Sequence, residues 1–159
     1  SGASTLRWFG PAWDEPICRI QAPSETPIGE ICPKCTQPIR AQLHYLVQTH
    51  LRLFLVQGTG LCALVLSEGR SKGQELGESF LPLQRRYTAP LMDLLARGQA
   101  SGEIRRDVSL RLLRSVVLGP MEHILWEVVA QAKDKPTDID AVATDLVALL
   151  WSAVQAPRP

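Results

Sequence analysis

The sequence carries no marked excess of charge of either sign. Its 159 residues include 17 Lys and Arg and 16 Asp and Glu, which leaves a formal net charge of +1. Proteins that bind nucleic acids by themselves usually carry a basic face, because neutralising phosphates supplies much of their affinity. We therefore do not expect this chain to bind DNA on its own.

A long hydrophobic run is also missing. The most apolar stretch, HLRLFLVQGTGLCALVL at residues 50–66, contains Arg52 and two glycines and is too short to span a bilayer. The first ten residues lack both the basic and the apolar part of a signal peptide. Four cysteines in a chain of this size do not make a disulfide scaffold. These absences predict a soluble, cytoplasmic protein that does not enter a membrane.

Common catalytic motifs are missing as well. The sequence has no Gly-rich phosphate loop, no Gly-x-Ser-x-Gly elbow and no His-Glu-x-x-His metal motif. Glu122 and His123 are adjacent, but neighbouring helical positions do not face each other, so their spacing does not form an acid–base pair. We expect His123 to be exposed or hydrogen-bonded, and we expect no enzyme activity.

Prolines divide the sequence into two unlike parts. Six of the 12 prolines fall within residues 1–40, so no helix of three turns fits between them. From Ile39 onward apolar residues recur at helical intervals, and no segment alternates with a period of two. We predict an irregular, Pro-rich segment at 1–38 and an all-α helical bundle at 39–156. The expected helices are 39–57, 60–69, 74–100, 109–132 and one that begins at Thr137.

Several residues indicate where these helices bend or end. Pro82 and Pro90 predict kinks or a break in the third helix, and Gly102 suits its C-terminal end. Asp107 or Ser109 is placed to cap the fourth helix. A Gly-Pro pair at 119–120 should bend that helix near its middle.

Cys32-Pro-Lys-Cys35 has the spacing of half a zinc site. Cys18 is the candidate third ligand and His44 the candidate fourth, with His50 behind it. A small Pro-rich segment with almost no core would gain order from a structural zinc ion. The alternative is an exposed loop with free thiols, because a full signature has two ligand pairs and only one is visible. Cys62 stands in an apolar helix and is expected in the core.

Three longer stretches resemble one family. LSEGR (66–70), RRYTAPLMDLLARGQASGEIRRDVS (85–109) and LGPMEHILW (118–126) resemble the C-terminal effector-binding and dimerisation domain of TetR-family transcriptional regulators, especially regulators of fatty-acid metabolism. The resemblance implies an α-helical domain with an apolar internal pocket and a homodimer formed by the last two long helices. It also implies a helix-turn-helix module, which residues 1–40 do not resemble. DNA binding would then require a module outside this sequence.

The resemblance suggests residues for both functions. We expect Phe54, Tyr87, Met121 and Leu125 to line a pocket for a small apolar, fatty-acyl-like effector. A filled core without a cavity is the alternative. Large apolar and aromatic side chains suit an interface, and the candidates on the last two helices are Leu113, Val117, Leu146, Leu150 and Trp151. Trp126 lies on the same pair of helices and suits either an interface or internal packing.

The N-terminal segment holds three large aromatic residues close together in sequence, Trp8, Phe9 and Trp13. It would dock on the helical body or form a patch for a partner. The favoured function is a ligand-sensing dimerisation domain. One rival is an interaction protein, in which the helices only dimerise and the zinc segment recruits a partner. A second rival is an enzyme that uses the cysteines or His123.

Overall fold

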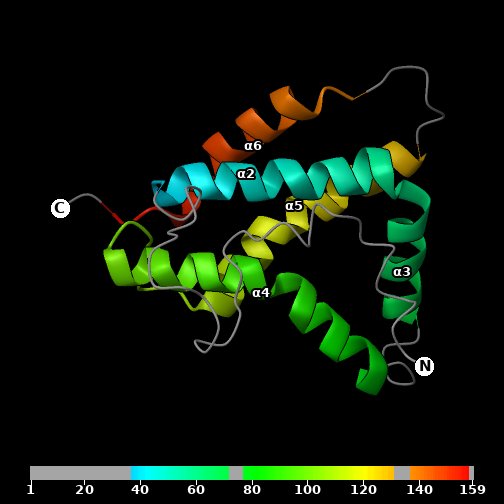
Figure 1. Ribbon diagram of the computed structural model, residues 1–159, viewed down its shortest axis with the longest axis horizontal. Coiled ribbons are helices and arrows are strands. Elements are labelled where there is room, and N and C mark those ends of the chain that lie inside the picture. Colours follow the sequence, from blue (N-terminus) through cyan, green and yellow to red (C-terminus); the bar gives the residue numbers. More distant parts are fainter. Residues whose placement is uncertain (1–36, 72–76, 131–136, 158–159) are drawn as a thin grey trace, which may run out of the picture. The chain divides into compact units, whose positions relative to one another are not determined.

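The computed structural model describes residues 37–71, 77–130 and 137–157. The chain divides into two units at Pro38, and the described residues belong almost entirely to the unit Ile39–Pro159. This unit consists of helices, with no strand among the described residues, which confirms the predicted all-α class. The elements are α2 (Ile39–Arg52), η2 (Leu53–Gln57), α3 (Thr59–Ser71), α4 (Gly77–Ser101), α5 (Leu110–Ala130) and α6 (Ile139–Val154) (Figure 1).

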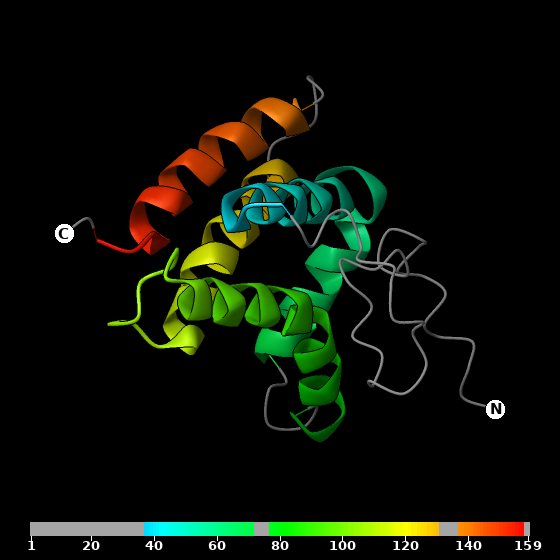
Figure 2. The same cartoon turned by 60° about the vertical axis from the view of Figure 1, so that its left-hand side comes forward.

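Helix α2 forms the middle of the helical unit. It packs against α6 and α4 and also contacts α5, and Figures 1 and 2 both show α6 running beside it. Leu43, Val47 and Leu51 recur every four residues on α2 and are completely buried. Burying a side chain of this kind contributes about 1.5–3 kcal/mol. The position of α2 therefore follows from the apolar face that its sequence encodes.

The helix expected at 39–57 changes its winding near its end. From Leu53 to Gln57 it is a π-helix, and the amide of Gly58 donates to the Leu53 carbonyl at 2.8 Å. Leu53, Phe54 and Leu55 of this segment are all buried. Short π segments inside helices often occur at functional sites. Here the segment places Phe54 in the interior, immediately before the chain turns into α3.

The connector between α4 and α5 joins three helix ends. Ile104 is 1% exposed and forms an isolated antiparallel bridge with Gln155, just beyond α6. The Ala156 amide donates to the Glu103 carbonyl at 2.9 Å, and the Glu103 carboxylate accepts from the Ile39 amide, the first of α2, at 3.3 Å. Residues of the family-like stretch 85–109 therefore hold the ends of α2, α4 and α6 together.

Two glycines allow this connector to form. A Cβ atom on Gly98 would lie 2.5 Å from the Cδ1 atom of Ile104 and 3.1 Å from Cγ2 of Ile39, so only glycine permits the close approach. Gly102 has a φ of 82°, which side chains disfavour. Arg106 then donates to the carbonyls of Gln99 and Ala100 at 2.6 and 3.0 Å, which satisfies the end of α4.

The other helix ends follow the sequence closely. Ser109 caps α5 by accepting from the Leu112 amide at 3.3 Å, whereas Asp107 pairs with Arg105 instead. Asp138 caps α6 and accepts from two amides at 3.1 Å each. Helix α4 bends part-way along its length (Figure 1), and Pro90 in its interior removes one helical hydrogen bond.

Among the described residues no single helix is long and apolar enough to cross a membrane. Ile39–Gln57 together with Cys62–Glu68 would pass that test of length and composition as a pair bent by 97°. The buried helices of an ordinary core pass the same test, and the apolar face of α2 is buried in this way.

Candidate functional site

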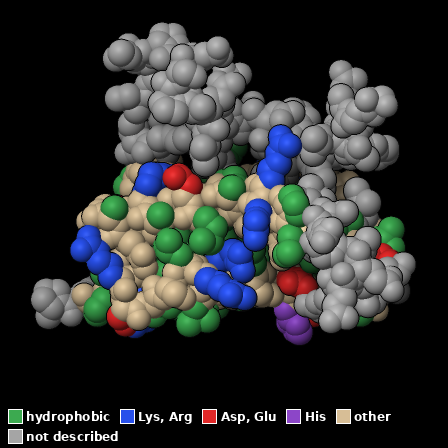
Figure 3. All heavy atoms as spheres, turned by 90° about the horizontal axis from the view of Figure 1, so that it is seen from below, with side chains coloured by type: hydrophobic (Ala, Val, Ile, Leu, Met, Phe, Trp, Pro, Cys, Tyr) green, Lys and Arg blue, Asp and Glu red, His purple; other side chains and the backbone are tan. Residues whose placement is uncertain are grey.

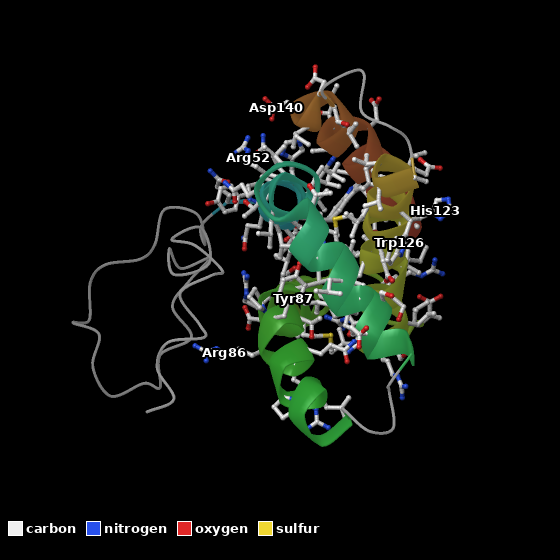
Figure 4. The ribbon with its side chains drawn as sticks, turned by 90° about the vertical axis from the view of Figure 1, so that its right-hand side faces the viewer. Arg52, Arg86, Tyr87, His123, Trp126 and Asp140 are labelled. Carbon is white, nitrogen blue, oxygen red and sulfur yellow. The ribbon has the colours of Figure 1, made fainter. Side chains whose placement is uncertain are left out.

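Three rings from three elements meet in the interior of the helical unit. His50 lies near the end of α2 and Phe54 lies in η2. Tyr87 lies in α4 and is labelled in Figure 4. The ring centroids of His50 and Phe54 are 4.0 Å apart, and those of His50 and Tyr87 are 5.4 Å apart. The Phe54 and Tyr87 rings stack at 6.5 Å with an interplanar angle of 14°. We call these three residues the aromatic cluster.

A hydrogen bond joins the two polar members of the cluster. The Tyr87 hydroxyl bonds with the Nδ1 atom of His50, and His50 is only 2% exposed. Burial lowers the pKa of His50 to about 3. Burial also raises the pKa of Tyr87 above its ordinary value, and the charge of Cys62 acts in the same direction. Both side chains are therefore uncharged near neutral pH.

Helix α3 adds a thiol to the surroundings of this cluster. Cys62 is buried, as the sequence predicts, and its burial raises the pKa of the thiol. Helix α3 packs against both η2 and α5. Two polar atoms on α3 and α5, Thr59 Oγ1 and Trp126 Nε1, are buried and have no hydrogen-bond partner among the described residues. Sequence periodicity gives no signal for such unpaired atoms.

The structure brings two of the four predicted pocket residues together. Phe54 and Tyr87 share the aromatic cluster, whereas Met121 and Leu125 are completely buried on α5. Because α5 packs against η2 and α3, all four side chains belong to one interior. Sequence reasoning missed the part that His50 plays here, although its spacing of four residues from Phe54 on one helical face was a usable signal.

Most of the predicted interface residues are buried within a single subunit. Leu113 and Val117 on α5 and Leu146 and Leu150 on α6 are 0–9% exposed within one subunit, so they offer almost no surface to a partner. Trp151 is partly exposed. On the same helices the large exposed apolar side chains are Leu112, Val129 and Leu149, at 55%, 46% and 71%. The apolar surface that α5 and α6 offer to a partner therefore comes from these exposed positions and from Trp151.

The predicted metal ligands are only partly described. Cys18, Cys32 and Cys35 lie outside the described residues, as do Trp8, Phe9 and Trp13. The His44 ring nitrogen Nε2 lies 3.4 Å from the Thr144 hydroxyl of α6. His50 is occupied with Tyr87. Residues 37–71, 77–130 and 137–157 contain no group of three or more possible ligands.

The charged side chains of the surface are mixed. His123 is exposed, and its Nε2 atom lies 3.4 Å from Oε1 of Glu127, one helical turn away. Figure 3 shows one face of the molecule, on which Lys and Arg side chains are spread among hydrophobic and other groups. The described surface in this view is therefore not the uniformly basic face of a DNA-binding domain.

A surface hollow of about 370 Å³ lies at the connector and includes Arg105, Arg106 and Pro157. Its arginines already have partners, because Arg105 pairs with Asp107 at 2.7 Å and Arg106 caps α4. We therefore do not place the effector site there.

Comparison with known families agrees with this arrangement. The sequence profile of the tetracyclin repressor-like C-terminal domain matches residues 36–126, which is more than half of the chain. The chain belongs to this family. It has the fold of the ligand-binding and dimerisation domain of a TetR-like transcriptional regulator. A comparison with curated proteins gave no match. The matched residues extend from the start of α2 into α5 and include the whole aromatic cluster.

Proposed function

We propose that this TetR-like domain binds a small apolar, fatty-acyl-like effector beside the aromatic cluster. The observation that carries the proposal is the meeting of the rings of His50, Phe54 and Tyr87. Met121 and Leu125 are buried on α5, which packs against η2. Ligand sites in proteins are mostly apolar and aromatic, with a few polar groups that orient the ligand. The cluster has this composition, and family membership supports ligand binding in general.

The effector would act on the junction between α2 and α3. His50 and Phe54 lie on either side of the change from α-helix to π-helix, and Gly58 comes directly after the π-helix. A ligand that contacts this junction shifts the arrangement of the two helices only if it binds one arrangement better than another. We propose that the shift is relayed through α2 to a DNA-binding module outside this chain, and that the domain itself has no enzyme activity.

We propose that two copies associate through the exposed faces of α5 and α6. Leu149 is the most exposed large apolar residue of the described chain, and Leu112 and Val129 lie on the neighbouring helix. Apolar side chains at such exposure suit an interface core, because burial against a partner removes them from water. Membership of the family supports a homodimer in general.

One rival function remains open to test. In it the helical domain only dimerises, and residues 1–38 bind zinc and recruit a partner. The zinc ligands would be Cys18, Cys32 and Cys35, with His44 as the fourth. His44 would have to give up its contact with Thr144 to reach a metal. The exposed apolar residues of α5 and α6 favour this rival as much as they favour sensing.

Native mass spectrometry combined with a dye titration tests these functions. N-phenyl-1-naphthylamine is an uncharged, apolar dye that becomes fluorescent when it leaves water. The sensing function predicts saturable dye binding at one site per subunit, and the mass spectrum should show a dimer. Dimers that bind zinc but no dye would favour the rival function. A monomer that binds neither would refute both.

A further inference from the structure

The buried polar residues of the described core fall into two groups. Gln42 accepts a hydrogen bond from Arg97 at 2.9 Å, and Thr88 donates to the Gln84 carbonyl of its own helix at 2.9 Å. Both have ordinary structural partners. His50 is buried too, but its partner lies on another helix: the hydroxyl of the half-buried Tyr87 bonds with His50 and so joins α2 to α4. Two apolar residues would hold these helices without the cost of desolvating polar groups.

Other polar atoms on the surrounding elements lack partners. Thr59 Oγ1 at the start of α3 and Trp126 Nε1 on α5 are buried without hydrogen bonds. In native proteins nearly all buried polar groups find a partner, so each exception requires an explanation such as a bound molecule. Helices α3 and α5 pack against each other, and α3 follows directly after η2, which holds Phe54. These atoms are an observation independent of the His50–Tyr87 bond.

Two charged side chains that the structure describes near this site, Arg52 and Arg86, are exposed. Arg52 lies 3.6 Å from Asp140 and both are exposed. Arg86, next to Tyr87 in sequence, is also exposed, and Figure 4 shows it directed away from the helices around Tyr87. Among the side chains that the structure describes, the polar groups on α2, α3, α4 and α5 include a phenol, an imidazole, a thiol, a hydroxyl and an indole N–H, all of which are uncharged near neutral pH.

We propose that the effector is an uncharged molecule with an apolar body and one hydroxyl, carbonyl or amide group, and that this group hydrogen-bonds with the Tyr87 hydroxyl. The inference rests on the proposed function and narrows its ligand class. An isolated charge is costly to bury without a partner, so a carboxylic acid would enter only in its protonated form. A fatty-acyl chain therefore fits as an alcohol, ester, thioester or amide, and not as a free carboxylate.

The test uses four ligands with the same ten-carbon body. Decan-1-ol, decanamide, decanoate and decylammonium compete with the dye N-phenyl-1-naphthylamine for the full chain at pH 7.3. The alcohol and the amide should bind tightest, and the two ions at least about a hundredfold more weakly. A carboxyl group titrates near pH 4.3, so the affinity for decanoate should rise about tenfold for each unit by which the pH falls. The affinity for decan-1-ol should stay constant between pH 6.3 and 8.3.

Substitution of the proposed contact residue localises the effect. Tyr87→Phe should weaken the binding of decan-1-ol and decanamide by about three- to tenfold, the range expected for the loss of one hydrogen bond. It should leave the affinity for the dye unchanged. Tyr45→Phe changes the other of the two tyrosines and should alter nothing. If Tyr87→Phe does not fold, the order of the four ligands in the unsubstituted protein still decides the proposal.

The possible outcomes separate the proposal from the function beneath it. Dye binding with equal affinities for all four ligands, or with decanoate tightest and independent of pH, overturns the uncharged-ligand proposal and leaves apolar sensing intact. Unchanged alcohol binding in Tyr87→Phe overturns the contact with Tyr87. Absence of binding for the dye and for all four ligands overturns both the proposal and the sensing function.

Discussion

The close contact at Gly98 makes a quantitative prediction about stability. Replacement by alanine would put a Cβ atom 2.5 Å from Cδ1 and 2.7 Å from Cγ1 of Ile104. Ile104 is 1% exposed and held between α4 and the chain beyond α6, so it has little space to move. Overpacking of this kind costs about 1–3 kcal/mol.

The same substitution also has a favourable effect. Alanine inside a helix is better than glycine by about 0.5–1 kcal/mol, because glycine loses more backbone freedom on folding. For Gly98→Ala the two effects leave a net loss of about 0.5–2 kcal/mol. Gly60 in α3 provides the matched control, since a Cβ there meets nothing within 4 Å. Gly60→Ala should therefore stabilise the fold by about 0.5 kcal/mol.

Urea unfolding followed by circular dichroism at 222 nm measures both variants. Protein concentration must be kept equal, because association of subunits adds to apparent stability. The two free energies of unfolding should differ by about 1–2.5 kcal/mol, with Gly98→Ala the lower. If Gly98→Ala is as stable as Gly60→Ala, Ile104 is not packed against position 98 as described, and steric contact does not explain the glycine there.

Three further predictions address the helix cap, the interface and pH. Asp138→Ala removes the acceptor for two amides of α6 and should lower the free energy of unfolding in urea by about 1 kcal/mol. Leu149→Lys should raise the dimer dissociation constant in sedimentation at least about tenfold, whereas Val56→Lys, at an exposed apolar side chain of η2, should not. Because the pKa of His50 is lowered from 6.5 to about 3, the unfolded chain binds a proton that the folded chain does not, and stability falls as the pH drops through this window. The loss should reach about 2 kcal/mol between pH 6.5 and 5 in urea titrations, and His50→Gln should remove that part of the slope.

The helices were predictable because their signals are local. Proline, glycine and capping residues act on their own stretch of backbone. The end of α4 near Gly102, a cap for α5 at Asp107 or Ser109, and the start of α6 to within two residues could therefore be predicted without knowing any tertiary contact. The π segment was not predicted. It depends on how Leu53 and Phe54 are buried against other elements, and apolar periodicity does not distinguish a π turn from the α-helix around it.

The interface shows a different limit of sequence reasoning. An apolar stripe on a helix indicates burial but does not say whether the partner belongs to the same chain. Leu113 and Leu112 are neighbours of equal hydropathy, yet one is 2% exposed and the other 55%. Of the five predicted interface residues, Leu113, Val117, Leu146 and Leu150 lie at the centre of the stripe, which a single subunit buries, and Trp151 is partly exposed. The proposed dimer would use the exposed edge of the stripe.

In the proposed sensing function, the fixed part and the responsive part of α2 lie at opposite ends of the helix. At its first residue the Ile39 amide is tied to Glu103 in a connector where Gly98 leaves no free space. At its other end His50 and Phe54 flank the change to the π-helix, and their main polar contact is one hydrogen bond to Tyr87. Rearrangement requires contacts that exchange at low cost, and one hydrogen bond contributes only about 1 kcal/mol net. Under the proposed function, a ligand that supplies an equivalent bond to Tyr87 would release this end of α2 while the connector holds the other end, and α2 would then pivot about the connector.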